Sequence, residues 1–223
     1  MTVTKQPYYA VVMGDLVHSE RTLSIELLHE RFNDAINQQN LLRKDSLASP
    51  LTITLGDEFQ GLAKSLQSGL QIARALRFQL LADSIECRFA IGLAELRTPI
   101  NADRAWNMMG PGLARTRSKL NEKRTQSLYR FAVTDDPVME TALEALGAGV
   151  TTIERRWTEQ QREDITALIA GASPADVARQ RNVSVHSIYK VRASGDYDTY
   201  VMQWRAIENI LTNIDALHGM SGC

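Results

Sequence analysis

Two acidic residues stand where strand-like runs are interrupted, and together they could hold a metal ion. Asp15 follows the apolar run 8–14, YYAVVMG, and Asp57 interrupts the run 51–63, LTITLGDEFQGLA. A strand interior disfavours Gly and Asp, so Gly56-Asp57 is expected at the tip of a hairpin. If the first strand and the hairpin are neighbours, the two carboxylates converge. Hard oxygen ligands of this kind suit Mg²⁺ or Mn²⁺, with water and phosphate oxygens completing the coordination.

A purely structural role for both acids is also consistent with the sequence. Gly and Asp are favourable residues for a hairpin turn, and Asp at a strand end often caps the following loop. Asp15, with Ser19 four residues later, could likewise cap a helix or a turn. The residue types alone leave both alternatives open.

The elements that must position these acids follow from the hydrophobic pattern. Apolar residues form strand-like runs in some segments and recur with helical spacing in others. Strands are expected at 8–14, 51–63 (a hairpin), 87–96 and 127–133, and helices at 23–43, 65–82 and from Asn101 or Asp103 to about Lys123. The order β-α-β-β-α-β-α-β predicts an α/β (α+β) fold with a ferredoxin-like palm sheet. Residues 110–112, GPG, are expected to interrupt the third helix.

Several of these segments resemble the class III nucleotidyl cyclases. Residues 9–19, YAVVMGDLVHS, look like the first-strand metal segment of those enzymes, and 51–61, LTITLGDEFQG, like their hairpin. The GDEF core also resembles the GGDEF hairpin of diguanylate cyclases, with Leu55 in place of the first Gly. Residues 88–92, RFAIG, resemble a later strand, and 110–117 loosely resembles the next helix. With its helical C-terminal part, the whole chain looks most like the SatD family of bacterial proteins.

The resemblance implies that these segments bind a nucleotide and a divalent metal ion, Mg²⁺ or Mn²⁺. Asp15 and Asp57 would be the metal ligands, with Glu58 as a third. A nucleoside triphosphate or a cyclic nucleotide would be contacted by Gly14, Ser19, Gly56, Arg115 and Arg117. The two arginines match phosphate oxygens well, but they belong to a run of charges that could instead be a solvated helix face.

The chain departs from the cyclase pattern at catalytic positions. Cyclases that use ATP often carry a Lys four residues before the hairpin Asp, where this chain has Ile53. The Asn and Arg of their late helix have no clean match, since Ala114 and Ser118 fall at those places. The resemblance therefore implies that binding can persist where cyclisation does not.

A second pattern, in the C-terminal part, predicts a helix-turn-helix. Ser173-Pro174 opens a helix, Asn182 tolerates the left-handed conformation of a turn, and Ser184 can cap the second helix. Ala178 is small where the two helices would cross, and 157–169 supplies a preceding helix. The unit resembles the DNA-binding domains of bacterial sigma factors and resolvases.

In such domains the second helix enters the major groove of DNA. The residues expected to contact DNA are Arg179, Arg181, Ser184, His186, Ser187, Tyr189, Lys190 and Arg192. His186 and Lys190 would reach base edges, whereas the three arginines would hold phosphates. A trihelical bundle used for protein contact, or as a structural cap, is the alternative.

The last predicted helix, about 197–217, carries a seam at alternating spacings of four and three. Its members are Tyr200, Trp204, Ile207, Leu211, Ile214 and His218. Such a seam either packs on the same chain or pairs two copies into a homodimer. We expect a cyclase-like domain at 1–135, a helical linker at 136–156, and a helix-turn-helix domain with the last helix at 157–223.

Composition limits the classes of function. The chain has 223 residues and a formal net charge of −1, which argues against polyanion binding over the whole surface. No apolar run approaches the roughly 18 residues of a membrane helix, and the first residues lack a secretory signal pattern. Cys87 and Cys223 are too few for a disulfide framework, so we expect a cytoplasmic protein.

Three hypotheses of function follow. The first is a DNA-binding regulator whose cyclase-like domain binds a nucleotide and a divalent metal. The second is an active nucleotidyl cyclase or nucleotidyltransferase, and the third is a catalytically degenerate scaffold.

Overall fold

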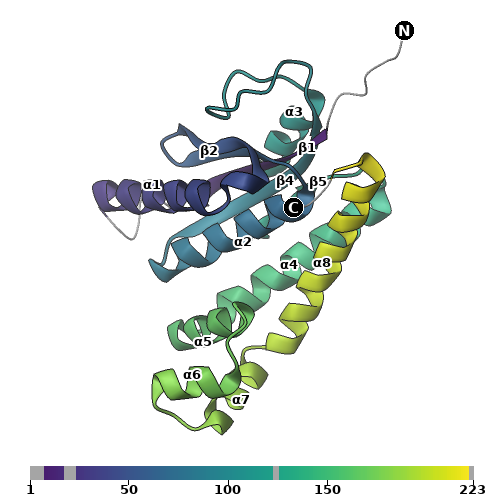
Figure 1. Ribbon diagram of the computed structural model, residues 1–223. Helices are drawn as coiled ribbons and strands as arrows, with labels where there is room; N and C mark the ends of the chain where they lie inside the picture. Colours follow the sequence, from purple (N-terminus) through teal and green to yellow (C-terminus); the bar gives the residue numbers. More distant parts are fainter. Residues whose placement is uncertain (1–7, 18–23, 123–125, 221–223) are drawn as a thin grey trace.

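Five strands form one sheet in the computed structural model, which describes residues 8–17, 24–122 and 126–220 (Figure 1). The strands are β1 (Tyr8–Val17), β2 (Leu47–Leu55), β3 (Glu58–Ala63), β4 (Glu86–Glu95) and β5 (Tyr129–Ala132), in the spatial order β2-β3-β1-β4-β5. Neighbouring strands are antiparallel, except that β5 joins β4 in parallel. The first four strands have the split arrangement of a ferredoxin-like sheet, so the predicted α/β fold with a palm-like sheet is confirmed.

Strand β1 is longer than predicted, and Asp15 lies inside it rather than after it. The strand continues because β4 runs alongside, pairing Leu16 with Cys87 and Val17 with Glu86. Gly56-Asp57 forms the turn between β2 and β3, as predicted.

Helices α1 (Ile25–Leu42) and α2 (Leu66–Ala82) cover one face of the sheet (Figure 1). The side chains of Ser24 and Ser65 accept hydrogen bonds from backbone N–H groups of the first turns, which sets where the two helices begin. Alternate residues of β1, such as Val12 and Leu16, are buried with the apolar sides of both helices.

Helix α3 (Pro111–Leu120) packs on the opposite face and is shorter than the predicted helix. The expected start at Asn101 or Asp103 is wrong, because the Asn101 side chain accepts from the backbone of Asp103 and Arg104 and holds a loop. Residues 110–112 do not interrupt a helix but begin one, with Pro111 in its first turn. The backbone of α3 lies very close to β4, since a Cβ at Gly112 would fall 2.1 Å from the carbonyl oxygen of Leu93.

The chain after β5 is helical, as the sequence predicted. The helices are α4 (Pro137–Arg156), α5 (Glu159–Ile169), α6 (Pro174–Arg181), α7 (Val185–Ser194) and α8 (Tyr197–His218). Helices α4 and α8 lie side by side next to α2, and α5, α6 and α7 form a unit at their far end (Figure 1). We call these three helices the α5–α7 unit. The division of the chain at residues 135 and 156 stays a prediction.

The seam of α8 packs within the same chain. Tyr200, Trp204, Ile207 and Leu211 are buried in the core that also holds β5, α2 and α4. One turn further on, the Asp215 carboxylate accepts from the backbone N–H groups of Leu66 and Gln67 at 2.7 and 3.0 Å, so α8 caps the start of α2.

Among the helices of the described residues, none combines the length and the apolar character needed to cross a membrane. Cys87 is a buried free thiol, and burial raises its pKa well above the ordinary value. A thiol in such surroundings is poorly nucleophilic. Cys223 lies outside the described residues.

Candidate functional sites

Two acids and an arginine form a row across the three middle strands of the sheet, close to the turn between β2 and β3. Asp15 of β1 is the register partner of Glu58 on β3 and of Arg88 on β4, so the three side chains share one face. This is the face on which α3 packs, since Met13, two residues before Asp15, is buried there. The Arg88 guanidinium lies 3.6 Å from the Asp15 carboxylate.

The second acid of the row is paired with α3. Arg117 donates to the Glu58 carboxylate at 2.7 Å and to the side-chain oxygen of Gln60 at 3.1 Å. Gln60 in turn donates to the carbonyl of Ala105. Carboxylates directly opposite each other on neighbouring strands repel, and Arg88 and Arg117 offset that repulsion.

Asp57, which was predicted as a metal ligand together with Asp15, is placed differently. It lies in the exposed turn, and its carbonyl oxygen accepts from the backbone N–H of Leu16 at 3.0 Å. The structure thus brings the turn to the end of β1, but Glu58 is the acid in register with Asp15.

The glycines and the serine that were predicted to contact a nucleotide lie in different surroundings. Gly14 is buried against Phe59, whose ring would lie 2.2 Å from an added Cβ, so the absence of a side chain there serves packing. Gly56 is exposed in the turn with open space around it. Ser19 lies outside the described residues.

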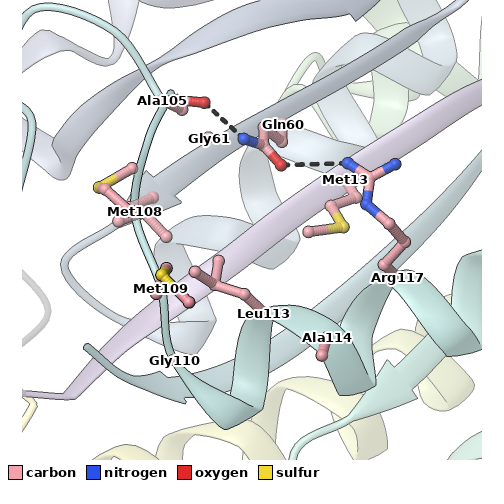
Figure 2. A pocket seen from close by; sticks show the side chains of 11 residues that line it. Met13, Gln60, Gly61, Ala105, Met108, Met109, Gly110, Leu113, Ala114 and Arg117 are labelled. Atoms are coloured by element: carbon pink, nitrogen blue, oxygen red, sulfur yellow. Dashed lines mark hydrogen bonds between the residues drawn. The ribbon is translucent and has the colours of Figure 1, made fainter. Parts of the chain in front are cut away.

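A pocket of about 300 Å³ opens beside the acid row, between the sheet, α3 and the loop before α3. Figure 2 shows apolar side chains along one side, with Gln60 and Arg117 hydrogen-bonded to each other at the other. The lining residues are Met13, Gln60, Gly61, Leu62, Ala105, Met108, Met109, Gly110, Leu113, Ala114 and Arg117. Its volume is at the lower end of small-molecule sites, which are mostly apolar with a few placed polar groups.

The two arginines predicted to contact a nucleotide point to different places. Arg117 lines the pocket, whereas Arg115 bonds to the carboxylate of Asp135 and the carbonyl of Thr134, next to α4. Residues two positions apart on a helix cannot face the same way. The structure therefore does not bring Arg115 to this pocket.

Two polar residues of this region were absent from the predicted contacts. Arg88 opens the RFAIG segment, and Gln60 follows the GDEF core directly. The alternation of side chains along a strand would have placed both on the face of Asp15, but only once the register between the strands was known.

The acid row fits a divalent metal that arrives with phosphates. Asp15 and Glu58 supply two hard oxygen donors, and Mg²⁺ commonly uses one or two carboxylates together with substrate phosphates and water. Within residues 8–17, 24–122 and 126–220, no group of three or more His, Cys, Asp or Glu side chains is placed to hold a metal. A cage made of protein ligands alone therefore does not describe this site.

The α5–α7 unit has a small core of its own. Leu168, Val177, Ala178 and Ile188 are buried together. Asn182 ends α6 in the left-handed conformation, and the Ser184 side chain accepts from the backbone N–H of Ser187 at 3.2 Å at the start of α7. Helix α6 thus ends, and α7 begins, at the residues that the sequence predicted as caps.

The eight predicted DNA contacts divide into three groups. Ser184 caps α7, and Ser187 donates its backbone N–H to that cap. Arg179 pairs with Asp176, Arg181 with the buried Asp164, and Arg192 with Asp198 while stacking on Tyr197. His186, Tyr189 and Lys190 are exposed on α7. Binding of DNA by this surface stays a prediction.

Comparisons with known proteins identify the family of the chain. The SatD family matches residues 8–195 of the chain. No curated protein matches the sequence significantly.

Among solved structures, a bacterial light-regulated adenylyl cyclase has 7% identity and a TM-score of 0.41, with 57% of this chain covered. This chain spans 43% of that protein's length. The guanylyl cyclase domain of the RhoGC fusion protein from the fungus Blastocladiella emersonii has 12% identity and a TM-score of 0.39, over 52% of this chain and 74% of that one. The adenylyl cyclase CyaB from P. aeruginosa has 15% identity and a TM-score of 0.37, over 52% of this chain and 71% of that one. Because the family match spans most of its length, the chain belongs to the SatD family.

Proposed function

We propose that this protein is a DNA-binding regulator whose sheet binds a nucleotide together with a divalent metal ion. The observation that carries the proposal is the row in which Asp15 and Glu58 face each other, each paired with an arginine, beside an open pocket. Two acids and two cations, the groups that a metal–phosphate site would need, thus lie together in the free protein.

The chemistry of the pocket suits the two halves of a nucleotide. Met108 and Leu113 offer apolar surface to a base, while Arg117 offers a planar fork that matches phosphate oxygens. Asp15 and Glu58 would hold the metal ion, which neutralises phosphate charge when bound. Arg88 and Arg117, released from the carboxylates, would then turn to the phosphates.

Binding without turnover is favoured over an active cyclase. Ala114, at the place of the cyclase Asn, lines the pocket with a methyl group that can neither donate nor accept a hydrogen bond. Regulation through a bound nucleoside triphosphate or cyclic nucleotide needs no such donor.

The DNA part of the proposal is supported by α7. His186, Tyr189 and Lys190 are exposed along one helix, which a major groove is wide enough to admit, and basic side chains flank it. Helix-turn-helix units usually bind paired half-sites, so the protein would act as a homodimer, and it would do so in the cytoplasm. Light scattering at micromolar concentration would check the homodimer.

A thermal-shift panel tests the nucleotide site. ATP, GTP, CTP, UTP and cyclic nucleotides would each be added with and without Mg²⁺ or Mn²⁺. A ligand at 100 times its Kd adds about 2.7 kcal/mol to the free energy of unfolding, which raises Tm by roughly 5–10 °C for a chain of this size. A metal-dependent rise with one nucleotide is the expected result, and the absence of any shift across the panel would reject the site.

A further inference from the structure

We propose that helix α3 couples occupancy of the pocket to the α5–α7 unit through its ion pairs with α4. The inference rests on the proposed nucleotide site and concerns the regulation of that site. Helix α3 contacts the pocket rim on one side, through Arg117, and the start of α4 on the other, through Arg115 and Lys119. It is therefore the element that both places share.

The contact with α4 is a cluster of five charged residues, which we call the charge cluster. Its members are Arg115, Lys119, Asp135, Glu140 and Glu144. Lys119 contacts Glu140 directly and lies 3.7 Å from Glu144, and only 15% of its side chain is exposed. Burial acts to lower the pKa of Lys119, but the surrounding glutamates outweigh it and raise the pKa. Pairs shielded in this way hold their geometry better than exposed surface pairs.

On the other side of α3, the partners of Arg117 would differ between the free and the ligand-bound protein. In this structure it bonds to Glu58 and Gln60. A metal ion on Glu58 and an anionic ligand in the pocket would draw its guanidinium away from both. The first turn of α3 is held against β4 by the close approach at Gly112, so an adjustment falls on the later turns, which carry Arg117 and Lys119. Coupling requires an element with two arrangements of this kind.

Helix α4 connects the charge cluster to the α5–α7 unit. It has 20 residues, and therefore a length of about 30 Å. Directly after it, the Trp157 indole donates to the carbonyl of Gly195, the residue that ends α7, at 2.7 Å. The end of α4 thus bonds to the end of the helix proposed to contact DNA.

The direct contact between the α5–α7 unit and α2 is less complete. A cavity of about 420 Å³ separates the end of α2 from α5, with Phe78 and Leu81 on one side and Thr166 and Ala167 on the other. Arg162 crosses this gap with a long hydrogen bond of 3.4 Å to the carbonyl of Leu81. Ile165 of α5 and Val191 of α7 pack against the main core, so a small change of angle at the end of α4 would shift the unit about those contacts.

The test measures the affinity of the full chain for a short, fluorescein-labelled, mixed-sequence DNA duplex by anisotropy. It is done with and without Mg²⁺ and ATP or GTP, whichever raises Tm more. In the wild type, the nucleotide should change the DNA Kd at least about fivefold, and DNA should change the nucleotide Kd by the same factor. Lys119→Met and, separately, Glu140→Gln should reduce that change to below about twofold. Both variants should keep the nucleotide-induced rise in Tm and the DNA affinity measured without nucleotide.

Arg31→Gln is the matched control, because it removes an ion pair with Asp83, 3.9 Å away, on the other face of the sheet. It should retain the full coupling. Wild-type protein that binds both ligands without mutual effect, or a Lys119→Met variant with unchanged coupling, would overturn the inference and leave the proposed function standing. Wild-type protein that gives no nucleotide shift or no DNA binding would reject the proposed function, and the coupling with it.

Discussion

Asp15 and Glu58 lie directly opposite each other on neighbouring strands, with Arg88 beyond the first and Arg117 beyond the second. Like charges in that position destabilise a sheet, so a purely structural row would do better with one of the acids replaced. In the free protein, Arg88 and Arg117 offset the repulsion between the two carboxylates. In the proposed complex, the same four groups would be complementary to a metal ion and a phosphate chain.

Replacing one acid of this row should therefore abolish binding but not folding. We expect Asp15→Asn to lose the rise in Tm that Mg²⁺ and nucleotide produce together, while far-ultraviolet circular dichroism stays unchanged. Asp34→Asn, an exposed acid on α1, is the control and should keep the full rise. A normal metal-dependent shift in Asp15→Asn would remove Asp15 from the site.

The different directions of Arg115 and Arg117 give a matched pair of variants. Arg117→Ala should weaken nucleotide binding about tenfold or more, since a charge-assisted bond contributes roughly 1.5–3 kcal/mol. Arg115→Ala should leave the nucleotide Kd nearly unchanged, because its guanidinium is bonded to Asp135 and Thr134. Isothermal titration of both variants checks this, and equal losses would show that Arg115 also reaches the ligand.

The exposed lysine of α7 should matter for DNA. Lys190→Glu is expected to weaken binding of a mixed-sequence duplex strongly and to make the slope of log Kd against log salt less steep. Lys64→Glu changes the same charge at an exposed position following β3 and should have a much smaller effect. Gel-shift titrations at several salt concentrations measure both. If the wild type shows no salt-dependent binding, the DNA part of the proposal fails.

A buried carboxylate connects the sheet to the last helices. Glu154 of α4 pairs with the buried Arg77 at 2.9 Å and accepts from the hydroxyls of Tyr129 and Tyr200, both at 2.9 Å. Burial, and secondly the Glu154 charge, raise the pKa of both tyrosines, so their hydroxyls remain donors. Glu154→Ala leaves the Arg77 charge buried without its nearest partner and should cost about 3–5 kcal/mol in urea unfolding.

The matched control for Glu154 is Glu208→Ala. That residue pairs with Arg74 at 3.6 Å with a third of its side chain exposed, and its loss should cost less than about 1 kcal/mol. Similar costs for the two variants would mean that Glu154 does not organise the junction.

Asp215 should make stability depend on pH. Burial raises the pKa of its carboxyl, more than the two backbone hydrogen bonds from Leu66 and Gln67 lower it. The folded protein therefore holds this proton more tightly than the unfolded chain does. The contribution of Asp215 to the free energy of unfolding falls as pH rises from the ordinary carboxyl pKa through the raised one. Asp215→Asn should flatten that part of the curve measured by urea unfolding, with Asp34→Asn as the control, and an unchanged curve would contradict the assignment.

The sequence was sufficient to predict the elements that depend on residues close to one another in the chain. The order of strands and helices, the turn at Gly56-Asp57 and the caps at Ser173 and Ser184 all depend on residues close in sequence. The start of α3 was missed because a side chain, that of Asn101, bonds its own loop and competes with helix formation.

The candidate site was predictable only in part. Asp15 was found from its place in an apolar run, but its pairing with Glu58, rather than with Asp57, follows from a register that no local pattern encodes. The spacing of Arg115 and Arg117 already places them on different sides of α3, but only the packing of α4 beside Arg115 decides that Arg117 is the one that lines the pocket. Which side chains face a ligand is thus decided by contacts distant in sequence.

The cap that Asp215 places on the first turn of α2 joins residues 149 positions apart in the chain. Forming a contact between residues so far apart in sequence costs loop-closure entropy, and folds that depend on such contacts form more slowly. During synthesis, the start of α2 emerges long before its cap and before the aromatic residues of α8 that cover its side. Until α8 has left the ribosome, that side of α2 stays exposed to solvent. A nascent chain halted before residue 197 is therefore expected to be a substrate for chaperones rather than a finished domain.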